Sequence, residues 1–306
     1  MTALERILIA LALLVGAAPA AVALEEGCRP LHEAEVNWDG PPEFDNGLLW
    51  KITGAAAEPS YLFGTIHVGD SAVLDLPEPV SSALDRSRVF AMEVLPDPAQ
   101  VVMFSTLMFF GDGQRLDQVL PASLYARTVN ILNRYQLPEQ AVAGMKPWAA
   151  FLTMSYPPGA EVVLDLQLLE RAEQSGAELH GLETMEEQGS VFNDLDLPDQ
   201  VQLLTDTVCH YEIISADFDR MKELYLERDL KGLSVYGQRH AFEDNTLYER
   251  VTERLLTDRN RLMVERMLPL IESGDAFVAV GAMHLPGSGG ILSLLSERGY
   301  GIERVY

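Results

Sequence analysis

The sequence predicts a mixed α/β (α+β) fold, in which strands from both ends of the chain form a central mixed sheet and a large helical cap is inserted between them. Strand-like apolar runs occur at 61–66 and 276–280, whereas about 99–274 shows mostly the 3.6-residue apolar spacing of helices. Each terminal run leads into a similar Gly-x-x-His segment, at 64–67 and 281–284. Because side chains at the carboxyl ends of strands face the ligand crevice in such folds, we expect the two histidines to meet there.

Residues 1–23 have the features of a secretory signal peptide. Arg6 precedes an apolar stretch at 7–16, and small residues occupy 21–23, as they do before a cleavage site. The apolar stretch is too short to span a membrane as a stable helix. We therefore expect an exported protein, periplasmic or secreted, with no stable membrane span after the signal is removed.

The remaining elements are expected in a simple order. Residues 24–47, rich in Glu, Pro, Gly and Asn, form an extended lead-in, and one domain occupies 48–306 with the cap at about 99–274. Apolar runs bounded by Gly or Pro predict strands at 48–52, 61–66, 88–94, 178–182, 276–280 and 300–305. Helical spacing, with acidic or proline starts, predicts helices at 80–87, 99–110, 121–134, 146–155, 161–175, 184–194, 198–228, 240–272 and 291–298.

The composition restricts the classes of partner. The chain has 22 Lys and Arg against 46 Asp and Glu, which gives a formal net charge of −24. Such a field repels nucleic acid and anionic membrane surfaces, so we expect no nucleic-acid partner. The chain also lacks the sequence motifs of the common nucleotide-binding, serine hydrolase and zincin sites.

The chain has two cysteines, Cys28 and Cys209. In an oxidising compartment an even cysteine count favours a disulfide, which here would attach the amino-terminal lead-in to the middle of the chain. The alternative is two unpaired thiols, one of them buried. We predict the bridge between Cys28 and Cys209.

Two carboxylates are expected near the paired histidines, His67 and His284. Glu93 is the only charged residue in its apolar run, where a carboxylate is costly unless it is paired or binds a metal. Glu183 directly follows another predicted strand, again at the carboxyl end. The alternatives are turn histidines bonded to the backbone, a Glu93 that reaches water, and a Glu183 that is an ordinary acid at a helix start.

These donors are typical of a mixed nitrogen–oxygen metal site. We predict that His67, Glu93 and His284 bind one divalent transition metal, which lowers the pKa of bound water and supports hydrolysis. The alternative is a site without metal, in which a His–Glu pair acts as general acid and base. Arg259 or Asn260, inside a later amphipathic helix, is placed to stabilise an oxyanion or bind a substrate carboxylate, unless that polar face is simply solvated.

Several short motifs, taken in order, resemble a known family. They are YLFGTIH at 61–67, AMEV at 91–94, KPW at 146–148, LD and LL within 164–169, GLET and EQ within 181–188, RN at 259–260 and VGAMH at 280–284. Each motif is weak alone, but together they resemble the TraB/GumN family, which includes the Tiki metalloproteases of animals. The resemblance covers about 48–305, nearly all of the chain after the lead-in.

The resemblance implies a metal-dependent peptidase. The family's two Gly-x-x-His motifs and strand glutamate correspond to His67, His284 and Glu93, and the Tiki branch is described as using Mn or Co. We therefore expect an exported hydrolase that acts on a peptide or small-molecule substrate with a divalent metal, Mn, Co or Zn. In this hypothesis Glu93 or Glu183 moves the proton and Arg259 stabilises the oxyanion. The alternative is a non-catalytic periplasmic protein that binds a peptide, a metal or haem in the same crevice.

Overall fold

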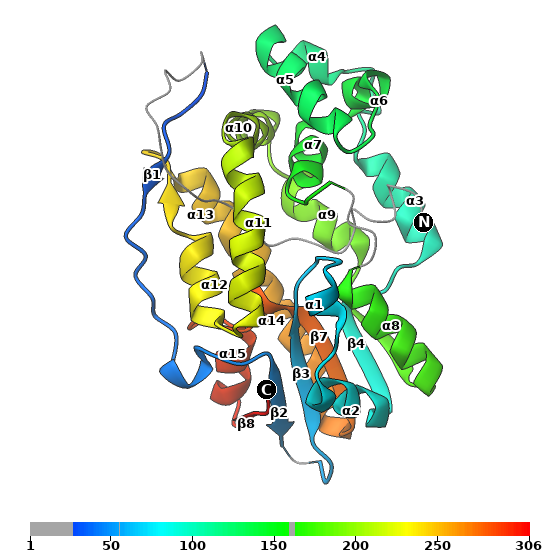
Figure 1. Cartoon of the computed structure of the whole chain (residues 1–306). Helices are drawn as coiled ribbons and strands as arrows, with labels where there is room; N and C mark the ends of the chain where they lie inside the picture. Colours follow the sequence, from blue (N-terminus) through cyan, green and yellow to red (C-terminus); the bar gives the residue numbers. More distant parts are fainter. Residues whose placement is uncertain (1–26, 55, 159–162) are drawn as a thin grey trace.

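The computed structural model describes residues 27–54, 56–158 and 163–306 (Figure 1). The expected signal peptide at 1–23 lies outside these ranges and stays a prediction. Within them, the chain forms a six-stranded mixed sheet, a two-stranded ribbon and a large set of helices. The mixed α/β class predicted from the sequence is confirmed.

The six-stranded sheet combines strands from both ends of the chain, in the order β5-β4-β7-β3-β2-β8. The strands are β2 (Leu49–Thr53), β3 (Ser60–Thr65), β4 (Val89–Val94), β5 (Glu178–Glu183), β7 (Ala276–Gly281) and β8 (Gly301–Arg304). β3, β7, β4 and β5 are parallel, and β2 is antiparallel to both of its neighbours. Because β3 pairs with β7, the two strands that precede the histidines are neighbours, as predicted.

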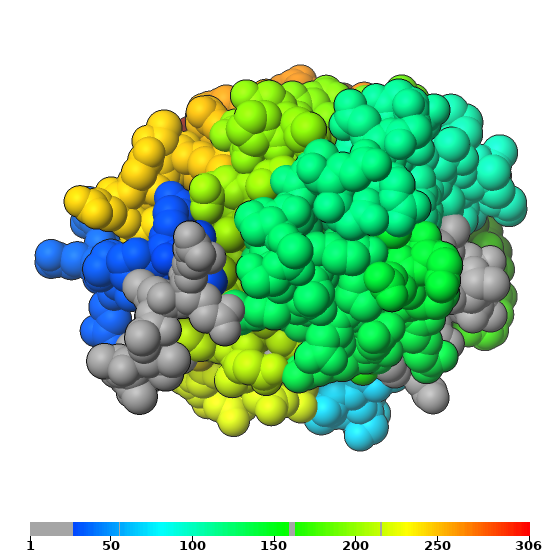
Figure 2. Space-filling view, turned by 90° about the horizontal axis from the view of Figure 1, so that it is seen from above, coloured from blue at the N-terminus to red at the C-terminus, as the bar shows by residue number. Residues whose placement is uncertain are grey.

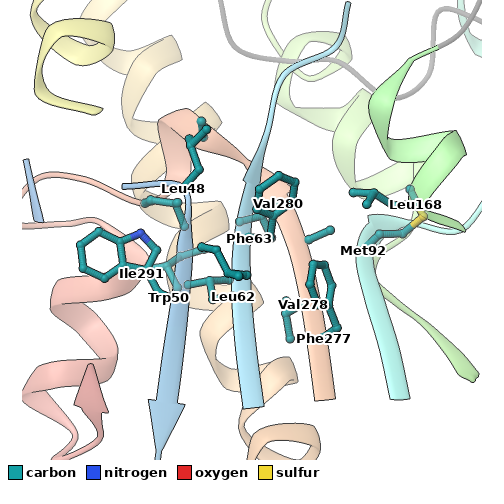
Figure 3. Packing of buried hydrophobic residues seen from close by; sticks show 14 of the residues in the cluster. Leu48, Trp50, Leu62, Phe63, Met92, Leu168, Phe277, Val278, Val280 and Ile291 are labelled. Atoms are coloured by element: carbon teal, nitrogen blue, oxygen red, sulfur yellow. The ribbon is translucent and has the colours of Figure 1, made fainter. Parts of the chain in front are cut away.

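The centre of the sheet is strongly apolar. Every residue of β7 is buried, and Phe277 stacks on Phe90 of β4 with ring centres 6.2 Å apart. Figure 3 shows Phe277 beside Phe63 of β3, and the ring centres of this pair are 6.0 Å apart. Continuous apolar runs of this kind are expected for parallel strands with both faces covered.

Helices cover both faces of the sheet. In Figure 1, α2 (Glu78–Arg86) and α8 (Leu164–Ser175) lie in front of the strands, and α14 (Arg259–Ser273) lies behind them. α8 packs against β4 and β5, whereas α14 packs against β4, β5 and β7. Two shorter helices, α1 (Ser71–Leu74) and α15 (Ile291–Glu297), also lie near the sheet, and α15 packs on β8.

The helical cap has a hydrophobic core of its own, centred on Phe104, Trp148, Phe151 and Phe192. Its helices are α3 (Pro98–Leu107), α4 (Leu116–Val119), α5 (Ala122–Asn133), α6 (Glu139–Gly144), α7 (Pro147–Met154), α9 (Met185–Asn193), α10 (Leu197–Cys209) and α13 (Thr246–Thr252). α11 (Tyr211–Leu226) contributes Tyr211 to this core and its later residues to the core of the sheet, to which α12 (Leu230–Gly237) also contributes. Seen from the cap side, residues coloured green and yellow-green cover much of the molecule (Figure 2).

Two long helices expected in the cap are divided. The helix expected at 198–228 breaks at His210 into α10 and α11. The helix expected at 240–272 contains β6 (His240–Ala241), α13, a π-helical stretch at Glu253–Asp258 and α14. The short helices α4, α6 and α12 have no counterpart in the sequence prediction. The residues around both breaks, 199–228 and 240–258, include no proline or glycine and keep a helical apolar spacing, so spacing alone does not reveal the breaks.

The amino-terminal segment is attached to the rest of the protein at several points. β1 (His32–Glu33) pairs with β6, and Phe44 of the short η1 helix (Pro42–Phe44) packs edge-on against Trp50. Cys28 and Cys209 form the predicted disulfide, with Cα atoms 5.7 Å apart. Among the residues that the structure describes, no helix has the length and apolar character needed to cross a membrane.

Candidate functional site

The predicted site residues lie where the parallel strands end. His67 follows β3, and His284 belongs to a 3₁₀ turn, η3 (Ala282–His284), directly after β7. Glu93 is near the end of β4, and Glu183 is the last residue of β5. These strands run toward the cap (Figure 1), so the four side chains lie between the sheet and the cap.

Both histidines are held through their Nδ1 atoms. Nδ1 of His67 donates to Oδ2 of Asp165 at 2.8 Å, and the other oxygen of Asp165 accepts a hydrogen bond from Thr65 at 2.7 Å. Nδ1 of His284 donates to Oδ1 of Asn260 at 2.6 Å, and the amide nitrogen of Asn260 donates to a backbone carbonyl at 2.9 Å. These partners fix both rings and make Nε2 the ring nitrogen that is available to a ligand.

The two imidazoles and Glu93 surround Gly281. The N–H of Gly281 donates to Oε1 of Glu93 at 2.7 Å, and this oxygen lies 3.7 Å from Nε2 of His284. A Cβ atom at position 281 would be 3.2 Å from that oxygen, 3.5 Å from Cδ2 of His284 and 3.8 Å from Nε2 of His67. The absence of a side chain at Gly281 thus leaves a small space bordered by two imidazoles and a carboxylate.

A buried guanidinium holds the two carboxylates. Nη2 of Arg259 donates to Glu93 at 2.6 Å and to Glu183 at 2.7 Å, and Nε donates to both oxygens of Glu183 at 3.0 Å. Gln188 donates to Glu93 at 3.1 Å and to Glu183 at 3.4 Å. Arg259 and both glutamates are buried. In such a cluster, removal of one partner leaves an uncompensated buried charge.

Burial and charge together set the protonation states. Burial alone would raise the pKa of Glu93, but Arg259 and the two histidines outweigh it and lower this pKa to about 2. Burial lowers the pKa of His284 to about 3. Burial also acts to lower the pKa of His67, but Asp165 outweighs it and raises this pKa. At neutral pH, Glu93 is therefore an anion and His284 is a neutral imidazole, the forms in which both residues bind metals.

The donors at Gly281 fit a divalent transition metal by their chemistry. Two imidazole nitrogens and one carboxylate face the same space, and each imidazole is oriented by a second polar side chain, as is usual for metal-bound histidine. As the side chains stand, no group of three or more His, Cys, Asp or Glu in the described ranges has the arrangement of a metal site. Joint ligation by His67, Glu93 and His284 therefore requires these side chains to move closer together.

A small apolar pocket opens beside His67. Its volume is about 40 Å³, and it lies between the end of β3, the η3 turn, α11 and α12. His67 and Gly281 both line it. The side chain of His67 is 11% exposed, compared with 2% for His284 and 6% for Glu93. Solvent therefore meets the histidine pair on the His67 side, through this pocket.

The structure brings His67, Glu93 and His284 together and places Arg259 directly against Glu93. Arg259 also borders a separate pocket of about 290 Å³, which His67 does not line. Asn260 contacts His284 and lines neither of these two pockets. The contacts of Arg259 and Asn260 are those of positioning residues, and their expected substrate-binding roles stay predictions.

Three further residues belong to the site. Asp165 orients His67, Gln188 contacts both carboxylates, and Gly281 provides the open space. The identity of these residues gives no reason to choose them from the other acids, amides and glycines of the chain. Their places in the LD, EQ and Gly-x-x-His motifs are the signal that points to them.

The sequence matches known proteins over most of its length. The model of the TraB/PrgY/gumN family matches residues 48–304. Similar proteins include metalloprotease TIKI1 of Danio rerio (28% identical over 86% of this chain), metalloprotease TIKI2 of Danio rerio (26% over 90%) and metalloprotease TIKI1 of Homo sapiens (26% over 84%). The matches cover 64%, 64% and 62% of these relatives, so the chain spans just under two thirds of their length.

No solved structure is significantly similar to the chain. The family assignment therefore depends on the sequence match, which includes both Gly-x-x-His segments and every residue of the site described above. The chain belongs to the TraB/PrgY/gumN family.

Proposed function

We propose that the protein is an exported metal-dependent peptidase whose metal is held by His67, Glu93 and His284. The observation that carries the proposal is the pair of oriented imidazoles that face Glu93 around Gly281, beside a pocket. The similar proteins are named metalloproteases, which supports the same activity. Mn, Co and Zn are all compatible with a set of nitrogen and oxygen donors.

The residues of the chain orient the proposed metal ligands and compensate the charge of the carboxylates. A bound divalent ion would supply polarisation of a peptide carbonyl and a water of lowered pKa. Asp165 and Asn260 hold the Nδ1 atoms and leave the Nε2 atoms free to bind an ion, and Arg259 holds the Glu93 carboxylate in place. We assign proton transfer to the carboxylate pair Glu93 and Glu183, which Arg259 links.

A non-catalytic binding protein is the second candidate, and one observation favours it. Glu93 is already satisfied by Arg259 and by the N–H of Gly281, and no metal site is preassembled among the described residues. A protein of this kind would hold a peptide, a metal or haem in the crevice without turnover. A hydrolysis assay separates the two candidates, because they predict the same binding residues and opposite activities.

We also assign the protein to the periplasm or the extracellular space. The disulfide between Cys28 and Cys209 supports this assignment, because disulfides persist in oxidising compartments and are rare in the cytosol. The signal-peptide features of residues 1–23 support it independently. The net charge of −24 opposes a nucleic-acid partner, and the names of the similar metalloproteases support a peptide or another small molecule as the substrate class.

The test compares metal binding with peptide hydrolysis. Purified protein is stripped of metal and reloaded with Mn, Co or Zn, bound metal is measured by elemental analysis, and cleavage of a peptide mixture is followed by mass spectrometry. We expect His284→Ala to lose both metal and activity, because it removes a ligand. Glu183→Gln should keep the metal and lose activity, because the amide cannot accept and release the proton, while Glu93 still balances Arg259.

The matched control is His180→Ala. His180 is a partly exposed histidine of β5 whose Nε2 contacts Glu178, outside the site. This variant should keep both metal and activity. Equal turnover by the wild type and by His284→Ala would contradict the peptidase proposal, whereas metal binding without turnover by the wild type would support the binding protein.

A further inference from the structure

The apolar pocket beside His67 differs in character from the rest of this acidic protein. No Asp, Glu, Lys or Arg side chain is among the described residues that line it. Part of its lining comes from Ile66 and Val68 and from Ala282 and Met283, all within two residues of a site histidine in sequence. The chain as a whole is acidic, with a net charge of −24, but the described residues of this pocket's wall include no carboxylate. The pocket therefore offers no negative charge that would select a cationic side chain.

Two helices close the far side of the pocket. Phe218, Met221 and Tyr225 of α11 line it and are spaced by three and four residues, so they project from one face of that helix. Leu233 of α12 completes this wall. Tyr225 is fixed because its hydroxyl donates to the carbonyl of Gly64 at 2.9 Å. The pocket therefore has a defined shape that depends on how α11 and α12 pack over the end of β3.

The size of the pocket limits what it can accept. Its volume is about 40 Å³, and a single water requires roughly 10–15 Å³ by this measure, so there is room for about three such groups. If each carbon atom takes the room of roughly one water-sized group, the pocket holds the three or four carbon atoms of a valine or leucine side chain. An aromatic ring exceeds this room unless a wall residue moves.

The pocket is continuous with the reacting groups. His67 is the most exposed of the three proposed ligands, and Gly281, whose missing side chain leaves the space between the imidazoles, lines the same pocket. A peptide whose scissile bond lies at Gly281 therefore has one neighbouring side chain at the pocket mouth. Ser155 and Tyr156, which follow α7, also line the pocket.

We propose that this pocket is a specificity subsite, which receives one uncharged aliphatic side chain of valine or leucine size next to the scissile bond of a peptide substrate. The proposal rests on the proposed peptidase function for the position of the scissile bond. The selection itself is a property of the pocket, so it is measurable as equilibrium binding in the absence of metal and turnover.

The test uses short fluorescent peptides that differ at one position, which carries Ala, Val, Leu, Phe, Lys or Asp. Binding to metal-free wild-type protein is measured by fluorescence anisotropy, with the variable residue placed at each position in turn. At one position we expect Leu to bind about 10-fold more tightly than Ala, because the added carbon atoms fill an apolar pocket. Lys should bind more weakly than Ala at that position, because its cation loses water there and no carboxylate is among the described residues that line the pocket.

A variant assigns the preference to this pocket. Phe218→Ala widens the pocket at a partly exposed wall residue, so the preference should shift from Leu toward Phe. Phe109→Ala is the matched control, because Phe109 is also partly buried but packs against the core of the cap. An unchanged preference in Phe218→Ala, with melting temperatures of both variants close to wild type, overturns the proposal, as does equal binding of Leu and Lys at every position.

The two proposals fail in distinguishable ways. Aliphatic preference in the binding assay, with no hydrolysis after reloading with any metal, leaves the subsite standing and removes the peptidase function. Hydrolysis without any side-chain preference leaves the peptidase function standing and removes the subsite.

Discussion

At the scale of single residues, Arg259 is the positive charge on which two buried carboxylates depend. Its side chain is 5% exposed, and Nη1 donates to the carbonyl of Leu255 while the other nitrogens contact Glu93 and Glu183. Two carboxylates in one buried place are costly unless a cation compensates them. Arg259 therefore acts on stability and on the position of Glu93, and only through Glu93 on the chemistry.

The first prediction concerns Arg259→Met. Because this change leaves two buried carboxylates without a cation, we expect the free energy of unfolding to fall by about 3–5 kcal/mol in urea titrations at neutral pH. The neighbouring Arg261→Met is the control, since Arg261 is 61% exposed and its pair with Asp258 contributes at most about 1 kcal/mol. Similar losses in the two variants would show that the buried cluster does not stabilise the protein.

The second prediction concerns Gly281→Ala. The backbone at this position, with φ −53° and ψ 135°, is ordinary for alanine, so the effect comes from the added Cβ and not from strain. Because that atom lies 3.2 Å from Oε1 of Glu93, we expect metal affinity to fall by about 10-fold, as when the surroundings of a metal ligand are disturbed. Titration calorimetry measures it, with Gly111→Ala, which meets open space, as control. Wild-type affinity in Gly281→Ala would place the metal elsewhere.

The sequence allows the site residues to be chosen but not their partners. His67, His284 and Glu93 were predictable as neighbours because each is at or just beyond the carboxyl end of a strand, where parallel strands meet. The orientation of Arg259 toward Glu93, away from the pocket at His67, depends on how α14 packs against β4, β5 and β7. Such packing between distant segments leaves no mark in local spacing.

At the scale of elements, strands were easier to predict than helix ends. The six predicted strands of the sheet agree with β2, β3, β4, β5, β7 and β8 to within one or two residues at each end, because short apolar runs with turn residues on both sides have few other interpretations. The breaks at His210 and before Thr246 interrupt apolar spacing that continues across them. Whether a helix continues there depends on contacts made by the whole cap.

The third prediction concerns the junction of α9 and α14. Glu187 completes a capping box with Thr184 and also accepts two hydrogen bonds from Arg266, which lower the pKa of Glu187 to about 2. Because this pKa is below its usual value of 4.5, the stabilisation is fully present above about pH 4.5 and is lost as the pH falls toward 2. Glu187→Gln keeps a side chain able to cap the helix and removes the charge.

Urea unfolding of the wild type and Glu187→Gln, measured from neutral pH down to about pH 3, checks this prediction. The wild type should be more stable at neutral pH by less than about 1 kcal/mol, since Glu187 and Arg266 are each more than a third exposed and solvent screens their interaction. The difference should shrink as the pH falls below about 4.5. A difference that grows toward acid pH would contradict the assigned direction.

At the scale of the whole molecule, the candidate site lies at the junction of two structural parts. The sheet provides the histidines and Glu93, while α11 and α12 provide the far wall of the pocket at His67. The cap, with its own hydrophobic core, meets the sheet at Glu183 and Gln188. The predicted limits of the domain, 48–306, and of the cap, about 99–274, stay predictions. Within the predicted cap range, α8 and β5 belong to the sheet layer.

The fourth prediction concerns the disulfide, which joins residues 181 positions apart and fixes the amino-terminal segment beside α10. Replacing both Cys28 and Cys209 with Ser removes the cross-link and so raises the conformational entropy of the unfolded chain. We therefore expect the free energy of unfolding to fall by about 2–4 kcal/mol. Denaturant titration measures the loss, and reduced wild-type protein serves as the control because it should match the double variant. If reduction and substitution leave stability unchanged, the contacts of β1 with β6 and of Phe44 with Trp50 are sufficient to hold the segment.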